Sequence, residues 1–384
     1  MDRFTHIFTL TTHLAMRSRL VIAVFALCAA CKDTSLAPLP FTPNKGTVVL
    51  NGFGQQGLTL VPDTGTLTSF ISLPATFDGA SLRITRDTAL TTASKGGGDV
   101  LYVVDLVTGS KKPIQLPAAS NPSGAALIVG RPEASVAVAL RDSQAIAFVT
   151  NLGGATPTVT LRRNVGQCPV DVAQFDTELW VLDANQNCRT NFSTVGPSRL
   201  LRLRFANAVI DTFPLGASVI GASNMQMQGT NLFIGGFGQV NFGTGVVSQA
   251  GTIIKFDLEG GTIRQVAPVP PGAFGTVVAP GRDGFVYAFV YGDATTFPGR
   301  VVRVDSTALV ATGPFLPATT FLGLLAANTT TPVNCAAIGV DTRARIYCPV
   351  VGAAAASTMY VFNANLLLIR TINVGQGAVA VQAR

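Results

Sequence analysis

A hairpin motif recurs seven times along this chain, and its spacing restricts the possible folds more than any other feature. Each copy has a short apolar strand ending near Asp or Asn, a turn rich in Gly, Asn or Thr, and a second apolar strand. The copies begin at Leu58, Leu101, Ile146, Leu200, Thr252, Arg300 and Met359. Their turn residues, from Asp63 to Asn363, span 300 residues in six steps, a mean of 50 per unit. This period is typical of propeller blades, so we predict an all-β fold, a β-propeller with seven four-stranded blades.

The two ends of the repeat region predict how the ring closes. The first unit starts near Gly46 and lacks an innermost strand, whereas the last segment, from Gly377, has no hairpin after it. We therefore expect the C-terminal strand to complete the first blade, which hides sheet edges that would otherwise promote aggregation. The tetrapeptide Gly-Phe-Gly-Gln occurs at residues 52–55 and again at 236–239, and both copies should follow the second strand of a blade.

The segment Leu-Tyr-Val-Val-Asp-Leu-Val-Thr-Gly-Ser at Leu101 resembles the blades of YVTN and NHL-type β-propellers. This resemblance implies a propeller over residues 46–384. It implies no particular activity, because function in this architecture belongs to individual sites. The single tryptophan, Trp180, argues against WD40 and quinoprotein blades, which normally repeat a tryptophan, and we expect Trp180 and Phe175 in the core.

The first thirty residues resemble a bacterial lipoprotein signal peptide. An eleven-residue apolar run, Leu20 to Ala30, follows Arg17 and Arg19 and ends at Cys31. It is too short to span a membrane, which takes roughly 20 apolar residues. We expect residues 1–30 to be removed, Cys31 to be acylated, and residues 31–45 to form a proline-containing tether at the outer membrane of the cell envelope. Cysteine in place of the lipobox leucine leaves simple secretion after Ala30 as an alternative, and Met16 is an alternative start.

Composition excludes nucleic-acid binding as the main role. Charged residues make up 12% of the chain, and the formal net charge of +7 is scattered. The nearest basic clusters, Lys111-Lys112 and Arg162-Arg163, have no interleaved aromatic residues. We expect these pairs to be solvated strand ends.

Cysteines and histidines restrict the chemistry further. Beyond the leader the cysteines are Cys168, Cys188, Cys335 and Cys348, and matching hairpin ends favour the local pairs 168–188 and 335–348. A four-sulfur metal site is the alternative, but no Cys-x-x-Cys spacing occurs and an exported protein favours disulfides. Both histidines, His6 and His13, precede the predicted cleavage site. The mature domain therefore has no histidine for a catalytic triad or for binding zinc or haem.

The longest connections between second and third strands predict where a ligand binds, because they share a face with the links between blades. They are residues 183–198, 236–251 and 291–299. Their amides and aromatic rings suit a protein or glycan surface, and the alternative is that long loops merely vary. The candidate binding residues are Asn185, Asn187, Arg189, Asn191, Phe192, Gln239, Asn241, Phe242, Asp293 and Phe297.

Two function classes follow from these observations. The first is an envelope-anchored binding or scaffold module for a protein or glycan, without cofactor and without catalytic residues. The second is a carboxylate- or calcium-dependent hydrolase or lactonase with inward-facing acids at the central channel. Residues 183–187 superficially match the start of a calcium loop, but Cys188 stands where the sharp turn needs glycine, which favours an ordinary turn. A purely structural role in an outer-membrane assembly is a third possibility.

Overall fold

The structure is a computed structural model. It describes residues 46–65, 68–94, 98–131, 134–205, 210–241, 246–268, 273–292, 300–306, 321–322, 335–351, 356–365 and 367–383. The chain divides into two units, Met1–Pro40 and Phe41–Arg384, and every described residue belongs to the second. The predicted signal peptide, Cys31 and the tether lie outside the described residues. All the described elements are strands, and the described part of the chain contains no helix that could cross a membrane.

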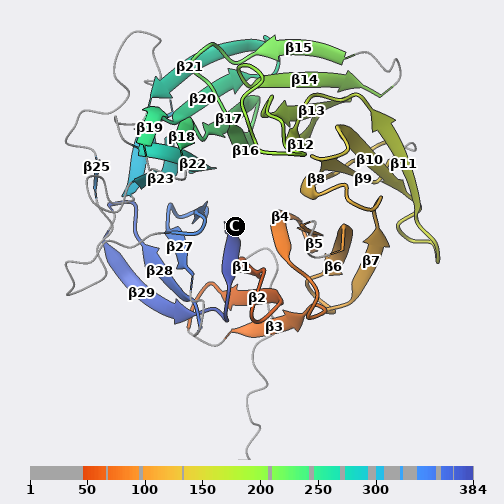
Figure 1. Ribbon diagram of the computed structural model, residues 1–384. Helices are drawn as coiled ribbons and strands as arrows, with labels where there is room; N and C mark the ends of the chain where they lie inside the picture. Colours follow the sequence, from red (N-terminus) through yellow and green to blue (C-terminus); the bar gives the residue numbers. More distant parts are fainter. Residues whose placement is uncertain are drawn as a thin grey trace, which may run out of the picture. The chain divides into compact units, whose positions relative to one another are not determined.

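The described strands form seven four-stranded sheets around a central axis (Figure 1). Three of them, from inner to outer strand, are β4 (Gly79–Thr85), β5 (Thr88–Ala93), β6 (Val100–Asp105), β7 (Lys111–Gln115); β8 (Pro122–Leu127), β9 (Val136–Leu140), β10 (Ala145–Thr150), β11 (Thr158–Arg163); and β12 (Pro169–Phe175), β13 (Glu178–Asp183), β14 (Arg199–Arg204), β15 (Ile210–Pro214).

The next three sheets follow in the same way, and one of them carries an inserted hairpin. They are β16 (Ala222–Gln228), β17 (Asn231–Gly236), β20 (Thr252–Asp257), β21 (Thr262–Pro268), with the hairpin β18 (Gln239–Asn241) and β19 (Val246–Gln249); β22 (Ala273–Pro280), β23 (Phe285–Gly292), β24 (Arg300–Asp305), β25 (Phe321–Leu322); and β26 (Gly339–Val340), β27 (Ile346–Val350), β28 (Thr358–Phe362), β29 (Leu368–Asn373).

The remaining sheet joins the two ends of the described chain. It has the order β3 (Ser69–Ser72), β2 (Gly57–Pro62), β1 (Gly46–Asn51), β30 (Ala378–Ala383). The antiparallel register of β1 and β30 places Val49 opposite Val381. The prediction of an all-β propeller is confirmed, and the last strand lies beside the first, as the ends of the repeat region indicate.

The predicted hairpins correspond to the outer strand pairs of the sheets, for example β6–β7, β14–β15 and β28–β29. Their turns depend on Asx side chains: Asp105 Oδ1 accepts hydrogen bonds from the backbone N–H groups of Val107 and Thr108, at 2.8 and 2.9 Å. The sixth hairpin differs from the prediction. Its first strand is β24, but the described partner is β25, which follows the predicted copy along the chain. The predicted second strand lies outside the described residues.

Apolar cores lie between neighbouring sheets, because each strand alternates its side chains between the two faces of its sheet. One core joins Trp180 and Leu182 of β13 to Ile234 of β17 and Phe256 of β20. The Trp180 and Phe256 rings lie 5.4 Å apart, edge to face. Trp180 is fully buried and Phe175 packs against the same core, as expected. This packing holds the inner strands around the axis, where the candidate site lies.

Candidate functional site

A cavity of about 1010 Å³ occupies one end of the central axis. Residues of β4, β8, β12, β16, β22 and β30 line it, together with the segment Ala336–Ile338 that leads into β26. Every described sheet therefore contributes to its wall. Most of the lining residues lie in the first half of their strands, so the cavity opens on the face where the inner strands begin.

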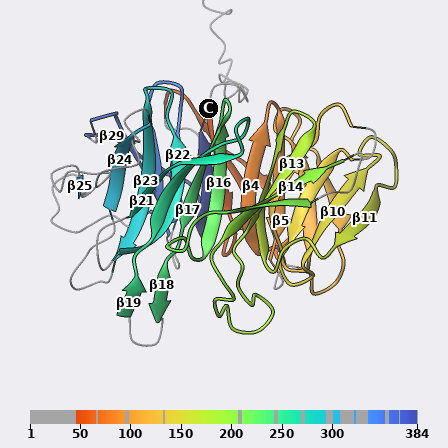
Figure 2. The same ribbon diagram turned by 90° about the horizontal axis from the view of Figure 1, so that it is seen from above.

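Two long connections project from this same face (Figure 2). One is the β13–β14 connection, residues 184–198, and the other carries the β18–β19 hairpin. The cavity is lined by Asn191 and Phe192 of the first connection, and by Phe237 and Gln239 of the second, where Gln239 is the first residue of β18. We call this side the loop-rich face; it is the face that the sequence predicts for a ligand.

A disulfide holds the first of these connections next to the cavity. Cys168, just before β12, is bonded to Cys188, and their Cα atoms lie 5.7 Å apart. Cys335 and Cys348 form the second disulfide, with Cα atoms 5.1 Å apart. Both predicted pairings are confirmed. Because Cys188 itself lines the cavity, the first bond fixes the position of the rim.

An ion pair crosses the cavity floor between two inner strands. Arg83 Nη2 of β4 donates to Asp171 Oδ1 and Oδ2 of β12 at 3.0 and 3.1 Å. Arg83 Nη1 donates to Gln226 Oε1 of β16 at 3.1 Å. The Asp171 carboxylate also accepts the backbone N–H groups of Val172 and Met225, at 2.9 and 3.0 Å. Three sheets are therefore joined through one carboxylate.

Gly124 of β8 leaves the space for this carboxylate. A Cβ atom at position 124 would lie 2.0 Å from Asp171 Oδ1 and 2.6 Å from Asp171 Cα. The second contact is to backbone and cannot be relieved by a change of rotamer. Glycine is therefore required here by the close approach of two inner strands.

Arg141, which follows β9, is the second cation of the cavity wall. Its Nη2 donates to Asn121 Oδ1 at 2.9 Å, and the Asn121 amide donates in turn to Asp142 Oδ1 at 3.3 Å. Arg141 Nε is buried and has no hydrogen-bond partner in the described part of the chain. Burial lowers the pKa of the Arg141 guanidinium, while the negative charge of Asp142 acts in the opposite direction.

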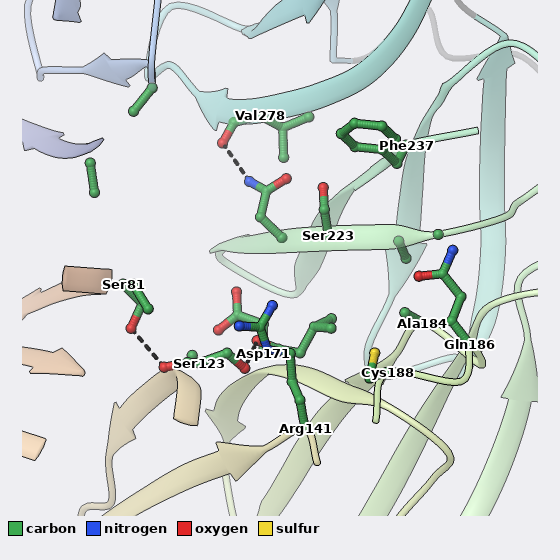
Figure 3. A pocket seen from close by; sticks show the side chains of 18 of the residues that line it. Ser81, Ser123, Arg141, Asp171, Ala184, Gln186, Cys188, Ser223, Phe237 and Val278 are labelled. Atoms are coloured by element: carbon green, nitrogen blue, oxygen red, sulfur yellow. Dashed lines mark hydrogen bonds between the residues drawn. The ribbon is translucent and has the colours of Figure 1, made fainter. Parts of the chain in front are cut away.

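The wall of the cavity has an apolar half and a polar half. The apolar half comes from β22, the segment before β26, and β30, and its residues are Val278, Ala336, Ala337, Ile338, Val379, Ala380 and Val381. The polar half comes from β4, β8, β12, β16, Arg141 after β9, and the rim. Figure 3 shows Ser123, Asp171 and Arg141 together on one side of the cavity, with Phe237 and Val278 on the other. Ser81 donates its hydroxyl to the Ser123 carbonyl at 2.7 Å, a bond drawn in Figure 3.

A second cavity of about 700 Å³ lies at the opposite end of the inner strands. The ends of β4, β16, β22 and β30 line it, with Arg86, Arg282 and Asp341 among its polar residues. Gln226 contributes to both cavities. The Arg83–Asp171–Gln226 bridge therefore lies close to the boundary between them.

Three of the predicted binding residues, Asn191, Phe192 and Gln239, line the larger cavity. Asn185, Asn187 and Arg189 belong to the same connection but are not among the lining residues. Asn185 Nδ2 donates to the Pro197 carbonyl at 2.9 Å and so holds the connection together.

The other predicted binding residues cannot be placed. Phe242, Asp293 and Phe297 lie outside the described residues, as does the side chain of Asn241.

The sequence reasoning missed Arg83, Asp171 and Arg141. For Arg83 and Asp171 the available signal was a charged residue inside a short strand that is otherwise apolar or neutral, as in Pro-Val-Asp171-Val-Ala, whereas Arg141 directly follows such a strand.

The residues described at the axis do not fit a calcium-dependent hydrolase. Asp171 is the carboxylate among the residues lining the larger cavity, and its oxygens accept the hydrogen bonds given above. Asp183, at the loop that superficially resembles a calcium site, accepts from the backbone N–H of Cys168 at 2.7 Å and from Arg199 Nε at 2.8 Å. The described residues contain no group of three or more His, Cys, Asp or Glu that could hold a metal ion.

No protein-family model and no curated protein matches the sequence. Among solved structures, the chain is similar to a protein from Lactobacillus plantarum, with a TM-score of 0.59 and 13% identity over 88% of this chain and 98% of that one. The β-propeller domain of Cps50 (Swd1) from Myceliophteria thermophila gives a TM-score of 0.52 and 9% identity over 79% and 90% of the two chains. Apo AztD from Citrobacter koseri gives 0.52 and 14% over 88% and 96%. At such identities the similarity shows the fold, and the chain is a β-propeller protein with a cavity on its axis.

Proposed function

We propose that this propeller is a binding module, and that its ligand enters the larger axial cavity from the loop-rich face. The observation that carries the proposal is the cavity itself, about 1010 Å³ and walled by every described sheet. Ligand sites are concave, largely apolar and provided with a few fixed polar groups, and this cavity has all three properties.

The carboxylates of the described cavity wall favour binding over hydrolysis, because of their number and because of the ion pair that Asp171 makes. Carboxylate catalysis of glycosyl transfer requires two carboxyl groups on opposite sides of the reacting bond. The described wall offers Asp171, which is neutralised by Arg83 at 3.0 Å. A hydrolase would need a second acid within reach of it.

We further propose that the partner is a protein or glycan of the cell envelope. The rim residues Asn191, Phe192 and Gln239 are exposed and combine amides with an aromatic ring, a composition suited to such a partner. Residues 1–30 would direct export, and Cys31 would carry the lipid that anchors the domain at the outer membrane. Two disulfides support an oxidising compartment.

We also infer that each of the seven sheets is one blade of a closed ring of the YVTN and NHL type.

Site-directed photo-crosslinking in the native envelope tests this proposal. A photoreactive amino acid would replace Phe192 at the rim or, as the matched control, Val107 on the β6–β7 turn at the opposite face. Both side chains are more than half exposed, at 51% and 63%. We expect a defined adduct from position 192 and none from position 107. Equal adducts from both positions, or none from 192, would refute a partner at this face.

Turnover assays on the purified full chain decide the hydrolase alternative. Lactone and glycoside substrates would be tested with the wild type and with Asp171→Asn. Turnover by the wild type that is lost in this variant, under conditions where the variant is still folded, would replace the binding proposal with the enzymatic one.

A further inference from the structure

The described residues that line the larger cavity carry more positive than negative charge, and the excess lies on the polar side. The charged lining residues are Arg83, Asp171 and Arg141. Arg83 and Asp171 neutralise each other at 3.0 Å. Arg141 gives a described hydrogen bond to the neutral Asn121. The residues that face a ligand therefore carry a surplus of one positive charge.

The carboxylate nearest to Arg141 in the sequence does not remove this surplus from the cavity. Asp142 attracts the Arg141 guanidinium, but it is buried, does not line the cavity, and accepts the Asn121 amide at 3.3 Å. Arg141 in contrast is both a lining residue and largely desolvated, with its Nε lacking a described partner. A cation held in this state is stabilised by an anion that enters the cavity, because ion attraction strengthens as water is excluded.

Among the described residues, the opposite half of the cavity has no polar side chain to hold a second charge. Its seven lining residues from β22, the segment before β26, and β30 are Val, Ala or Ile. Phe192 and Phe237 add aromatic surface at the rim. Burying apolar surface against this half contributes roughly 25 cal/mol for each Å² removed from water.

From these two halves we propose that the cavity binds an organic anion with an apolar body: one carboxylate, sulfonate or phosphate placed at Arg141, with the body against Val278, Ile338 and Val379. This inference rests on the proposed binding function and names the chemistry of the group that enters. The group can be a free small molecule or the end of an envelope partner, and both present the same two features.

Two fluorescent probes that differ in a single charged group test the proposal. Anilinonaphthalenesulfonate has an apolar body and one sulfonate, and N-phenylnaphthylamine has nearly the same body without the charge. We expect the purified full chain to bind both, the sulfonate more tightly. Removal of a charge-assisted hydrogen bond worth about 1.5–3 kcal/mol corresponds to a loss of roughly 10- to 100-fold in affinity.

The variants separate the role of the charge from that of the fold. Arg141→Gln should weaken the sulfonate probe roughly 10- to 100-fold and leave the neutral probe unchanged, which also shows that the cavity is intact. Arg141→Lys should restore most of the sulfonate affinity. Arg189→Gln removes an exposed cation from the same loop-rich face outside the cavity lining, so it should change neither probe.

The proposal is wrong if the two probes bind the wild type equally, or if Arg141→Gln leaves sulfonate binding unchanged. An adduct at position 192 together with failure of the probes would keep the binding function and overturn only the anion. Mass spectrometry of the purified native protein separates the two sources: a co-purified apolar acid identifies a free ligand, and a protein adduct at position 192 identifies a partner.

Discussion

The ion pair on the cavity floor gives the most direct test of how this propeller is held together at its axis. The perturbation is a double-mutant cycle with Arg83→Met, Asp171→Asn and the combined variant. Met preserves most of the apolar length of Arg, and Asn preserves an oxygen acceptor for the backbone N–H groups of Val172 and Met225. Each single variant therefore leaves its former partner as an unpaired, largely buried charge.

The expected magnitude follows from geometry and burial. Unit charges 3.0 Å apart attract each other by about 5 kcal/mol at an effective dielectric constant of ~20. Desolvation offsets part of this, since the Arg83 and Asp171 side chains are 17% and 9% exposed. Removing one partner of a buried pair costs roughly 3–5 kcal/mol, whereas replacing both is often close to neutral. We expect each single variant to lose about 3 kcal/mol and the double variant no more than that, a coupling energy of about 3 kcal/mol.

Urea unfolding of all four proteins, followed by tryptophan fluorescence from Trp180, measures the cycle. The slopes must agree between variants, because a changed slope signals a changed denatured state or loss of two-state behaviour. The pair of Arg204 and Glu178, at 3.5 Å, provides the control, because its side chains are more exposed, at 44% and 21%, and its expected coupling is below about 1 kcal/mol. Additive losses at Arg83 and Asp171, within about 0.5 kcal/mol, would refute a coupled buried pair.

Three further perturbations test the disulfide at the cavity rim, the buried Tyr287, and the close contact between Gly124 and Asp171 on the cavity floor. Replacing Cys168 and Cys188 by serine removes the disulfide between two residues that are 20 positions apart in the sequence. The free energy of unfolding in urea should fall by about 3 kcal/mol. It should also weaken both fluorescent probes, because Cys188 lines the cavity. Burial, followed by a hydrogen bond to a neighbouring carboxylate, raises the pKa of Tyr287 above its usual value of about 10. The protonated Tyr287 hydroxyl therefore contributes its full stabilisation below pH ~10, and this contribution is lost as the pH rises further. In Tyr287→Phe the urea midpoint should fall less steeply with rising pH than in the wild type. Gly124→Ala should lose about 3 kcal/mol in urea unfolding through its clash with the Asp171 backbone, and a loss below about 0.5 kcal/mol would contradict that clash.

Much of the fold could be predicted from the sequence because the outer hairpins carry local signals. Strands such as β6 and β28 combine apolar residues with an Asx turn directly after them, so their positions depend on nearby residues alone. The inner strands carry weaker signals. β8, with the sequence Pro-Ser-Gly-Ala-Ala-Leu, is made of small residues whose burial depends on the whole ring. The sheet that joins β1 to β30 could be predicted because the two incomplete ends of the repeat complement each other.

The candidate site could be predicted only as far as its face. Connections between second and third strands share a side by topology, so the sequence placed Asn191, Phe192 and Gln239 together on one face, and they line the cavity that opens there. The floor could not be predicted, since Arg83 and Asp171 are 88 residues apart and meet only when the ring is formed. No local pattern specifies which residues meet across the axis.

The two arginines of the cavity show how binding charges differ from structural charges in this protein. Arg83 donates to a carboxylate and to a side-chain amide, and both acceptors are anchored on other sheets, so its charge is used in joining strands. The Arg141 guanidinium donates to the neutral Asn121 amide, is attracted by the buried Asp142, and lies in a wall that faces a cavity of about 1010 Å³. Loss of the first should therefore lower stability, whereas loss of the second should change the affinity for an anion. If Arg141→Gln instead destabilised the fold as much as Arg83→Met, both charges would be structural and the cavity would lack its recognition group.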